Sequence, residues 1–324
     1  MNNFFIKLYS SIQNNNLTFS KIKYYSAQRF IIRLLANFLT PLSFHISNFL
    51  QKKPPHLSKK NDQLIVSLTT FPVRINKIWI VIECVLRQTH QPSRIILWLS
   101  KEQFKNENNL PKRLLKLKKR GLEIVFCERD IRSHKKYYYT LKEFPKSTLI
   151  TVDDDFIYPT NMIAELLTEH KKDPTAICCH RAHQIKTKNN TVLPYHDWSF
   201  CFDSTSSKME LFFTSGGGTL FPPSSLYKET LNKDVFIKIC KMADDVWLNA
   251  MAQLQNTSII KVPSKHAMHI PIIINNNVSL KSTNVVESQN DVQIEAVRNH
   301  FKSTTDRNIF EPIPEEENHQ KYDI

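Results

Sequence analysis

The first half of the chain alternates short apolar runs with longer stretches of helical periodicity. Four runs of five or six residues are rich in β-branched and aromatic side chains, as buried strands are: Leu64–Thr69, Arg94–Leu99, Leu122–Cys127 and Thr148–Val152. The segments between them repeat apolar residues at three- and four-residue steps, which predicts helices at Ile75–Arg87, Pro111–Arg120 and Lys135–Glu143. Strands that alternate with helices predict an α/β fold, in which helices cover both faces of a mostly parallel sheet.

The second half is less regular. Its patterns predict helices at Thr160–Lys171 and Asp244–Gln255, strands at Ala176–His180 and Ser258–Val262, and a closing helix near Asp291–His300. After residue 275 the chain becomes polar and rich in asparagine. We therefore predict one main domain over residues 61–275, followed by a C-terminal helix and polar tail over residues 276–324.

Residues 1–60 have a different texture. Apolar residues between Phe30 and Leu50 recur at helical spacing, which predicts an amphipathic helix that is broken or kinked at Pro41. The polar interruptions argue against a spanning helix. No small-residue cleavage site follows an early apolar run, so we expect no cleavable signal peptide. We interpret residues 1–60 as a helical arm and linker.

The charge distribution sharpens the interpretation of this arm. The formal net charge of the 324-residue chain is +14. Nine lysines and arginines precede Asp62, which is the first acidic residue, so most of the excess positive charge belongs to the arm. A basic amphipathic helix is suited to an anionic membrane surface. Packing against the main domain is the alternative, and we do not expect nucleic-acid binding.

Six cysteines without a C-x-x-C pair are typical of buried thiols in a reducing cytoplasm. We thus expect a cytoplasmic protein that lies peripherally on the cytoplasmic face of a membrane.

Three adjacent carboxylates, Asp153, Asp154 and Asp155, directly follow the fourth predicted strand. Their mutual repulsion at the end of a buried strand is costly without a cation. Carboxylate oxygens suit Mg²⁺ or Mn²⁺, and such an ion holds phosphate oxygens in turn. If the segment is extended, the side chains of Asp153 and Asp155 point to one side and serve the same metal. A solvated acidic turn is the alternative.

Glycine is concentrated at one place. The chain has four glycines, and three of them are Gly216, Gly217 and Gly218. Their clustering indicates a tight turn between strands or a close approach of the backbone to a ligand.

Several segments, in this order, resemble bacterial glycosyltransferases of the GT-A fold that build lipopolysaccharide and capsule. The main match is KKYYYTLKEFPKSTLITVDDDFIYP, which contains a D-x-D motif. The stretches SLTTFPVRI (residues 67–75) and CHRAH (residues 179–183) are similar to the same group, and the resemblance covers roughly residues 62–270. It implies a GT-A fold, a nucleotide-sugar donor that is usually UDP-linked, a divalent metal and a glycan or lipid-linked glycan acceptor.

The resemblance also implies roles for individual residues. On the donor side, the nucleotide would contact residues that follow the first strands and the lysines that open the third predicted helix: Thr69, Thr70, Arg74, Asp130, Asp153, Asp154 and one of Lys135 and Lys136, of which we choose Lys135. The metal ligands would be Asp153 and Asp155, joined by a late histidine, His269, in the segment that also holds His266.

On the acceptor side, the glycines Gly216, Gly217 and Gly218 would form the substrate-binding loop. The pair Asp244 and Asp245 would supply the catalytic base, and we favour Asp245 by its position. Helix capping is the alternative for this pair, because both residues stand at a predicted helix start.

The sequence therefore predicts a metal-dependent, inverting glycosyltransferase of lipopolysaccharide or capsule synthesis. A sugar-phosphate nucleotidyltransferase is the first alternative, although that class carries a glycine-rich loop where this chain has TTFPVR. A non-catalytic protein that binds a membrane surface through the arm is the second.

Overall fold

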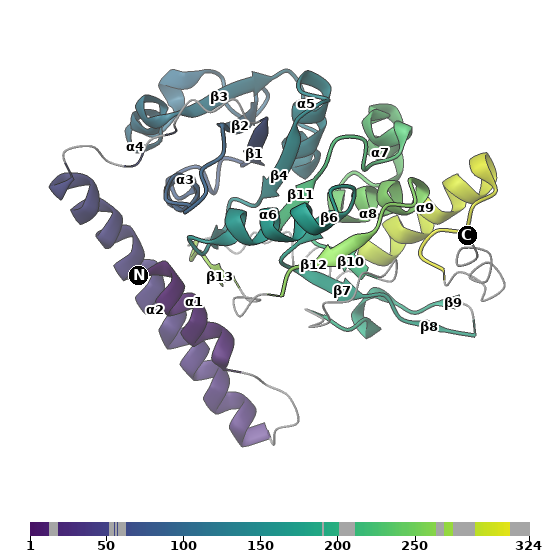
Figure 1. Cartoon of the computed structure of the whole chain (residues 1–324), viewed down its shortest axis with the longest axis horizontal. Coiled ribbons are helices and arrows are strands. Elements are labelled where there is room, and N and C mark those ends of the chain that lie inside the picture. The colour runs from purple at the N-terminus through teal and green to yellow at the C-terminus, as the bar shows by residue number, and fades with distance from the viewer. Residues whose placement is uncertain are drawn as a thin grey trace.

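The computed structural model describes residues 1–12, 19–51, 55, 57, 63–189, 191–200, 211–263, 269–274 and 289–311. A seven-stranded sheet in the order β12-β6-β11-β4-β1-β2-β3 forms its centre (Figure 1). The strands of this sheet are β1 (Leu64–Thr69), β2 (Arg94–Ser100), β3 (Leu122–Cys127), β4 (Thr148–Val152), β6 (Ile177–Cys179), β11 (Gly217–Phe221) and β12 (Ile259–Lys261). Neighbouring strands are parallel except at β11, which runs antiparallel to both β4 and β6. The predicted α/β class with a mostly parallel sheet is confirmed.

Helices and small ribbons complete the molecule. The α-helices are α1 (Asn2–Ser11), α2 (Phe19–Leu50), α3 (Ile78–Leu86), α4 (Lys112–Leu115), α5 (Lys135–Glu143), α6 (Met162–Lys172), α7 (Lys233–Ile239), α8 (Asp244–Leu254) and α9 (Gln289–Thr305). The 3-10 turns are η1 (Glu107–Asn109), η2 (Lys116–Arg120), η3 (Arg132–His134), η4 (Tyr195–Asp197) and η5 (Lys228–Leu231). Two-stranded ribbons pair β5 (Phe156–Ile157) with β13 (Ile270–Pro271), β7 (Ala182–Gln184) with β10 (Leu211–Phe213), and β8 (Thr187–Lys188) with β9 (Thr191–Val192).

Side chains alternate between the two faces of the sheet, and each face has its own cluster. Val66 and Leu97 pack on the face that α3 covers, whereas Ile65 and Trp98 pack beneath Tyr139 of α5 on the other. Both faces of the central strands are buried, as their near-continuous apolar sequences predict. The described cysteines fit this interior, since Cys84, Cys127, Cys178, Cys179 and Cys240 are all buried thiols.

Helix α5 is fixed on β1 and β2 by a short chain of polar contacts. The hydroxyl of Ser67 donates to the carbonyl oxygen of Lys136 at 2.5 Å, and that of Thr140 donates to Ser67 at 2.8 Å. The indole N–H of Trp98 completes the chain on Thr140 at 2.8 Å. All these groups are buried, so their hydrogen bonds set the position of α5 and of the lysine on its first turn.

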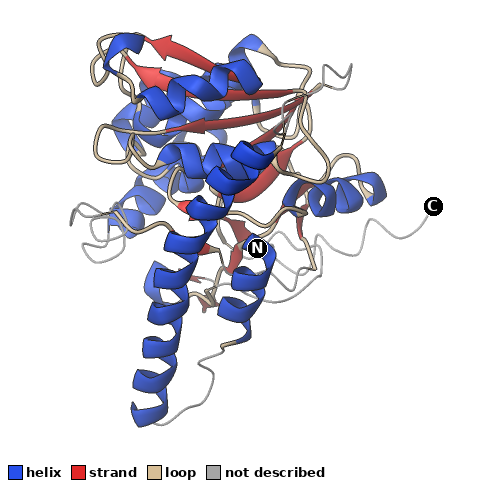
Figure 2. Cartoon of the chain, turned by 90° about the vertical axis from the view of Figure 1, so that its left-hand side faces the viewer, coloured by secondary structure: helices blue, strands red, loops and turns tan. Residues whose placement is uncertain are grey.

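The N-terminal arm is a pair of helices, α1 and α2, that projects past the body of the molecule (Figures 1 and 2). Helix α2 runs without interruption from Phe19 to Leu50, so the predicted break at Pro41 is wrong. Proline cannot donate the helical bond to the carbonyl of Asn37, but the helix is held by the domain on both sides of Pro41. The side chain of Asn37 donates to the carbonyl of Pro271 at 3.0 Å and accepts from the N–H of Ile273 at 2.8 Å, while Asn48 donates to Glu83 at 2.8 Å.

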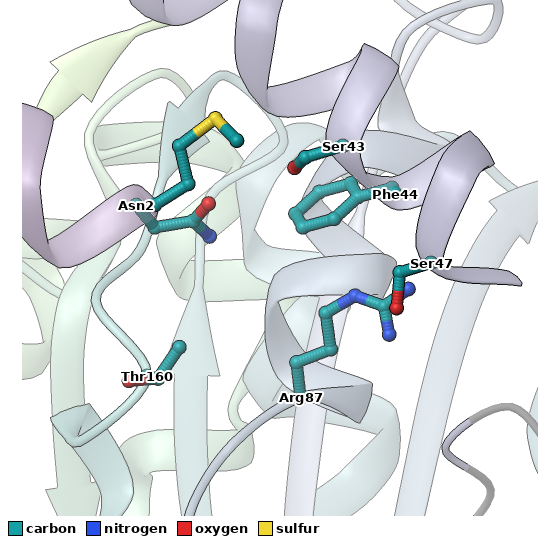
Figure 3. Close-up of a pocket in the computed structure, with 7 residues that line it drawn as sticks. Asn2, Ser43, Phe44, Ser47, Arg87 and Thr160 are labelled. Atoms are coloured by element: carbon teal, nitrogen blue, oxygen red, sulfur yellow. The ribbon is translucent and has the colours of Figure 1, made fainter. Parts of the chain in front are cut away.

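The arm shares the hydrophobic core of the main domain. Phe5, Ile6, Ala36 and Phe44 belong to the same buried cluster as the strands and α3. A pocket of about 290 Å³ remains along this seam, and none of the five aspartates at residues 153–155, 244 and 245 lines it (Figure 3). Its lining residues are Met1, Asn2, Ser43, Phe44, Ser47, Arg87 and Thr160.

We predict that Ala36→Leu destabilises the protein by about 1–3 kcal/mol, because Ala36 is fully buried between α2 and the domain and the extra side chain has no space. Leu35→Ala, one residue earlier and 47% exposed, is the matched control and should stay within about 0.5 kcal/mol of the wild type. Urea unfolding measures both. Equal stabilities would mean that α2 does not pack on the domain in solution.

Candidate active site at the edge of the sheet

Three segments meet where β1 and β4 end. Parallel strands end at the same edge of a sheet, so the residues after β1 and β4 are neighbours. Because β11 is antiparallel, its first residue lies at that edge too, and Gly217 pairs with Val152. The sheet topology thereby brings Asp153 beside the glycines that precede β11, although they are more than sixty residues apart in sequence.

Arg74 holds two of the three adjacent aspartates. Its guanidinium lies 2.5 Å from Asp154 and 3.0 Å from Asp155, and Thr70 donates a further hydrogen bond to Asp154 at 2.5 Å. The chain turns at Asp154 and Asp155, so the alternation expected of an extended strand does not apply to them. Asp154 is 5% exposed, which rules out the solvated acidic turn for this residue.

Lys136 of α5 joins the third aspartate to a distant carboxylate. Its ammonium lies 2.7 Å from Asp153 and 3.0 Å from Asp244 at the start of α8. The lysine side chain is 3% exposed and that of Asp153 is 38% exposed. One buried cation thus links the end of β4 to the N-terminus of α8, and Asp153 faces the solvent beside it.

Both aspartates of α8 are also bound by Ser215. The backbone N–H of Ser215 donates to Asp245 at 2.8 Å, and its hydroxyl donates to Asp244 at 2.7 Å. The N-cap residue is Ala243, so neither aspartate takes the N-cap position. Both lie in the first turn of α8, where the helix dipole favours negative charge, and their contacts with Ser215 also fasten α8 to the segment before the glycines.

Gly216 permits the closest approach in the site. A Cβ atom built on Gly216 would lie 1.8 Å from the carboxylate carbon of Asp153, so no larger residue fits while Asp153 keeps its position. Gly218 adopts φ +87°, a conformation that favours glycine, and a Cβ there would meet Met162 at 2.7 Å. The structure thus shows a tight turn at these glycines, as one interpretation of the sequence expected, and a close approach to the side chain of Asp153. The predicted close approach to a ligand stays a prediction.

Burial and the two cations give the carboxylates different pKa values. Burial raises the pKa of Asp155 to about 7, against the attraction of Arg74. Burial likewise raises the pKa of Asp245 to about 7, and the charge of Asp244 adds to this rise. Burial would also raise the pKa of Asp244, but Lys136 outweighs it and lowers the pKa to about 2. Asp244 is therefore a permanent anion, whereas Asp155 and Asp245 change charge near neutral pH.

Negative charge exceeds positive charge in this cluster. The five aspartates 153, 154, 155, 244 and 245 surround the two cations Arg74 and Lys136. No group of three or more His, Cys, Asp or Glu side chains forms a ready-made metal site in the described part of the chain. The donor chemistry nevertheless fits a hard divalent cation. The carboxylates of Asp153 and Asp155 are partly exposed and repel one another, and each shares its cation with a second aspartate.

Other predicted site residues lie outside this cluster. Thr69 donates to the carbonyl of Trp98 at 2.8 Å. Lys135 points to the end of β3, where it pairs with Asp130, and Asp130 also accepts from Gln103 at 2.8 Å. Of the two lysines considered for the diphosphate, Lys136 and not Lys135 reaches the aspartates that follow β4. The nucleotide-contact roles of Thr69, Asp130 and Lys135 stay predictions.

His269 contacts the glycine segment. Its Nε2 lies 2.5 Å from the carbonyl oxygen of Gly217, and its ring lies against Phe156 and Tyr158. This contact supports the turn that holds the aspartates, since Tyr158 in turn accepts from the N–H of Asp153 at 2.8 Å and donates to the carbonyl of Gly216 at 2.5 Å. A metal-ligand role for His269 stays a prediction, and His266 lies outside the described residues.

Sequence reasoning missed the parts played by Ser215 and Tyr158 and the bridging role of Lys136. Ser215 directly precedes the glycines, which was a usable signal. For Lys136 the signal was helical spacing, because Thr140 stands one turn later and shares the face of α5 that turns to the sheet.

The likeness of this chain to known proteins is one of fold. No protein-family model matches the chain, and no curated protein matches it. Solved structures that resemble it include the mannosyltransferase PcManGT from Pyrobaculum calidifontis in complex with GDP-Man and Mn²⁺, at 15% identity and a TM-score of 0.44, covering 86% of this chain and 75% of that one. S. aureus TarS 1–349 matches at 12% identity and a TM-score of 0.41, covering 75% of this chain and 72% of that one. UTP-bound UGPase from Acinetobacter baumannii matches at 8% identity and a TM-score of 0.39, covering 75% and 94%. These are distant likenesses in fold.

We predict that Lys136→Met lowers the free energy of unfolding by about 3–5 kcal/mol at pH 8, because Asp244 loses its buried partner. The loss should shrink as the pH falls, because without Lys136 burial raises the pKa of Asp244 and the variant then holds this group protonated. It should be smallest near pH 2, where Asp244 also takes up its proton in the wild type. Lys142→Met, at an exposed position of the same helix, should change stability little. A pH-independent loss would show that the charge of Lys136 is not what the fold requires.

Proposed function

We propose that this protein is a metal-dependent glycosyltransferase that uses a nucleotide-sugar donor, with UDP as the expected nucleotide. The observation that carries the proposal is the cluster of five aspartates around Arg74 and Lys136 at the carboxyl ends of β1 and β4. In sheets of this kind, that edge is where ligands bind. A cluster with more carboxylates than cations is suited to a ligand that arrives with a divalent cation, such as a nucleotide diphosphate.

Asp153 and Asp155 are the residues that would hold Mn²⁺ or Mg²⁺, and the ion would offset the charge on the departing diphosphate. Asp154 has a different role, since it is buried and bound by both Thr70 and Arg74. That contact fixes the chain after β1 to the chain after β4. Arg74 then keeps Asp155 in place without neutralising Asp153.

Asp245 is the proposed base for the acceptor hydroxyl. It is partly exposed, it is positioned by the N–H of Ser215, and its pKa of about 7 suits a group that takes a proton near neutral pH. Asp244 cannot share this work, because its pair with Lys136 keeps its pKa near 2. A base on the acceptor side predicts a single displacement with inversion. The acceptor would be a glycan or lipid-linked glycan of the lipopolysaccharide or capsule type, bound beside residues 216–218.

A nucleotidyltransferase is the competing function for such a cluster. The two reactions leave different products, because glycosyl transfer releases a nucleoside diphosphate and nucleotidyl transfer releases pyrophosphate. The loop after β1 contains Thr70 and Arg74 but no glycine. Two substrate sets decide between them. Nucleotide-sugars with acceptor glycans are assayed for released nucleoside diphosphate, and nucleoside triphosphates with sugar phosphates are assayed for released pyrophosphate.

We predict that Asp245→Asn lowers kcat by about 10²–10⁴-fold and leaves donor affinity nearly unchanged, because the amide keeps the hydrogen bond from Ser215 but cannot take a proton. In the wild type, kcat should fall about tenfold per pH unit below pH 7 and reach a plateau above it, following the pKa of Asp245. The variant should lose this limb of the profile.

Asp244→Asn is the matched control one residue earlier. It removes the partner of Lys136, so it should lower the melting temperature. It should keep the acid limb of the pH profile but move it to lower pH, because the charge of Asp244 contributes to the raised pKa of Asp245. An Asp245→Asn enzyme with wild-type kcat would reject the base. A loss of donor binding in that variant would instead place Asp245 on the donor side.

We also predict that Mn²⁺ with UDP raises the melting temperature by about 5 °C at a hundredfold excess over Kd. The shift should be larger at pH 8 than at pH 5.5, because Asp155 must lose its proton to bind a metal and burial raises its pKa to about 7.

Asp155→Ala should abolish the metal-dependent part of this shift and the transfer activity. Asp234→Ala, an exposed aspartate on α7, should retain both. Full turnover in excess EDTA would disprove the metal dependence.

A further inference from the structure

Helix α2 carries an apolar face that the domain leaves uncovered. Eight large apolar side chains between Phe30 and Phe49 are 43–89% exposed and recur at three- and four-residue steps, so they form one continuous stripe: Phe30, Ile31, Leu34, Leu35, Phe38, Leu42, Ile46 and Phe49. Phe4 and Leu8 of the neighbouring α1 are exposed as well, at 65% and 41%. A stripe of this size marks an interaction surface, because soluble proteins rarely expose such a patch without a partner.

The opposite face of α2 is tied to the domain along its length. Arg33 donates to the carbonyl of Pro271 at 3.2 Å, Asn37 binds the same strand, and Asn48 binds Glu83 of α3. These contacts extend over about four turns of helix. By length and composition alone, Tyr24–Leu50 could cross a membrane. A helix that keeps these contacts can meet hydrocarbon on one side only, so it lies in the plane of a bilayer and does not span it.

A basic segment adjoins the C-terminal end of the stripe. Helix α4 and η2 contain six basic residues in nine, Lys112, Arg113, Lys116, Lys118, Lys119 and Arg120, and no acidic one. They are joined to α2 through α3. His45 of α2 lies 5.0 Å from the ring of Trp79, and the guanidinium of Arg113 lies 4.7 Å from the same ring. Arg120 and Asn48 likewise both bind Glu83.

The basic segment still presents positive charge to the solvent. Lys118 pairs with Glu107, and Arg120 is half-buried on Glu83. Lys112, Lys116 and Lys119 are exposed. Past the C-terminal end of α2, the apolar stripe is therefore followed by a segment with exposed positive charge. This is the arrangement that suits acyl chains beneath anionic headgroups.

We propose that the exposed stripe of α2 and the basic segment of α4 and η2 form one docking surface for an anionic phospholipid bilayer, with α2 lying in the headgroup layer. The anionic leaflet expected from the sequence is the cytoplasmic one. The surface shares none of its residues with the carboxylate cluster, so the proposal stands or falls independently of the glycosyltransferase chemistry.

The test is co-sedimentation of the full chain with vesicles of phosphatidylcholine alone or with 30% phosphatidylglycerol. The wild type should prefer the anionic vesicles, and this preference should weaken with salt. The triple variant Phe38→Ser, Leu42→Ser, Phe49→Ser should lose binding to both vesicles by at least about 100-fold, since each buried apolar side chain contributes about tenfold. The triple variant Lys112→Glu, Lys116→Glu, Lys119→Glu should lose only the preference for anionic vesicles.

Matched controls change the same kinds of exposed residue elsewhere. Val292→Ser replaces an apolar side chain that is 60% exposed on α9. The triple variant Lys146→Glu, Lys171→Glu, Lys238→Glu makes the same change of charge at exposed positions of other segments. Both controls should bind vesicles as the wild type does. Unchanged melting temperatures and UDP–Mn²⁺ binding in all variants would show that the fold and the carboxylate cluster are intact.

Three outcomes would overturn the proposal. The first is a wild type that does not bind anionic vesicles. The second is an α2 variant that binds as well as its control. The third is a wild-type oligomer that the serine substitutions convert to a monomer without any effect on vesicle binding, since the stripe would then be a protein interface.

The in-plane placement has its own test. Bound protein should exchange to fresh, differently labelled vesicles within hours, and permanent retention would mean that α2 spans the bilayer.

Discussion

The ammonium group of Lys136 lies between Asp153 and Asp244, and much of the site depends on this contact. It joins the end of β4 to the beginning of α8 across the edge of the sheet, in a place where an unpaired charge would be costly. The lysine is itself positioned by the polar chain from Ser67 through Thr140 to Trp98. Arg74 performs the matching task between β1 and the two following aspartates. Two cations thus hold four of the five carboxylates, and the N–H of Ser215 holds the fifth, Asp245. The surplus of negative charge is left on the side chains that face the solvent.

Much of the parallel sheet followed from local sequence. Strands β1, β3 and β4 and helix α5 have the predicted bounds, because each is short, strongly patterned and bounded by polar residues. The end of β4 as a place for chemistry also followed, since three aspartates cannot lie there without compensation. The antiparallel strand β11 did not follow, because the pairing of Gly217 with Val152 is a long-range choice that no local pattern encodes. The contacts of Ser215 depend on that pairing. Whether Lys136 or Lys135 reaches the aspartates depends on how helix α5 is rotated about its own axis.

The arm shows how two expectations treated as alternatives can both describe one helix. Membrane binding and packing on the domain each require an apolar face, and α2 has enough apolar residues for two. Ile32, Ala36 and Phe44 are buried against the domain, while Phe38, Leu42 and Phe49 are exposed on the other side. A sequence pattern shows how many apolar residues the helix has. Only the position of the helix on the domain shows which of them are buried and which stay exposed. The described contacts also place the arm near the chemistry, because α2 binds Pro271 and the N–H of Ile272 donates to the carbonyl of Asp155 at 2.7 Å.

The contact between Gly216 and Asp153 constrains how this protein can change over evolutionary time. A side chain at position 216 would occupy the volume of the aspartate, so position 216 cannot vary while Asp153 keeps its place. The constraint runs one way, because a smaller residue at position 153 still leaves room for glycine. Among descendants of this chain, a larger residue at position 216 should therefore occur only where the aspartate has moved or been lost, even though 62 residues separate the two positions. A lineage that replaced the glycine would have to give up the carboxylate first, and with it whatever ligand the carboxylate binds. Loss of this glycine is thus an inherited mark of the lineages that keep only the fold.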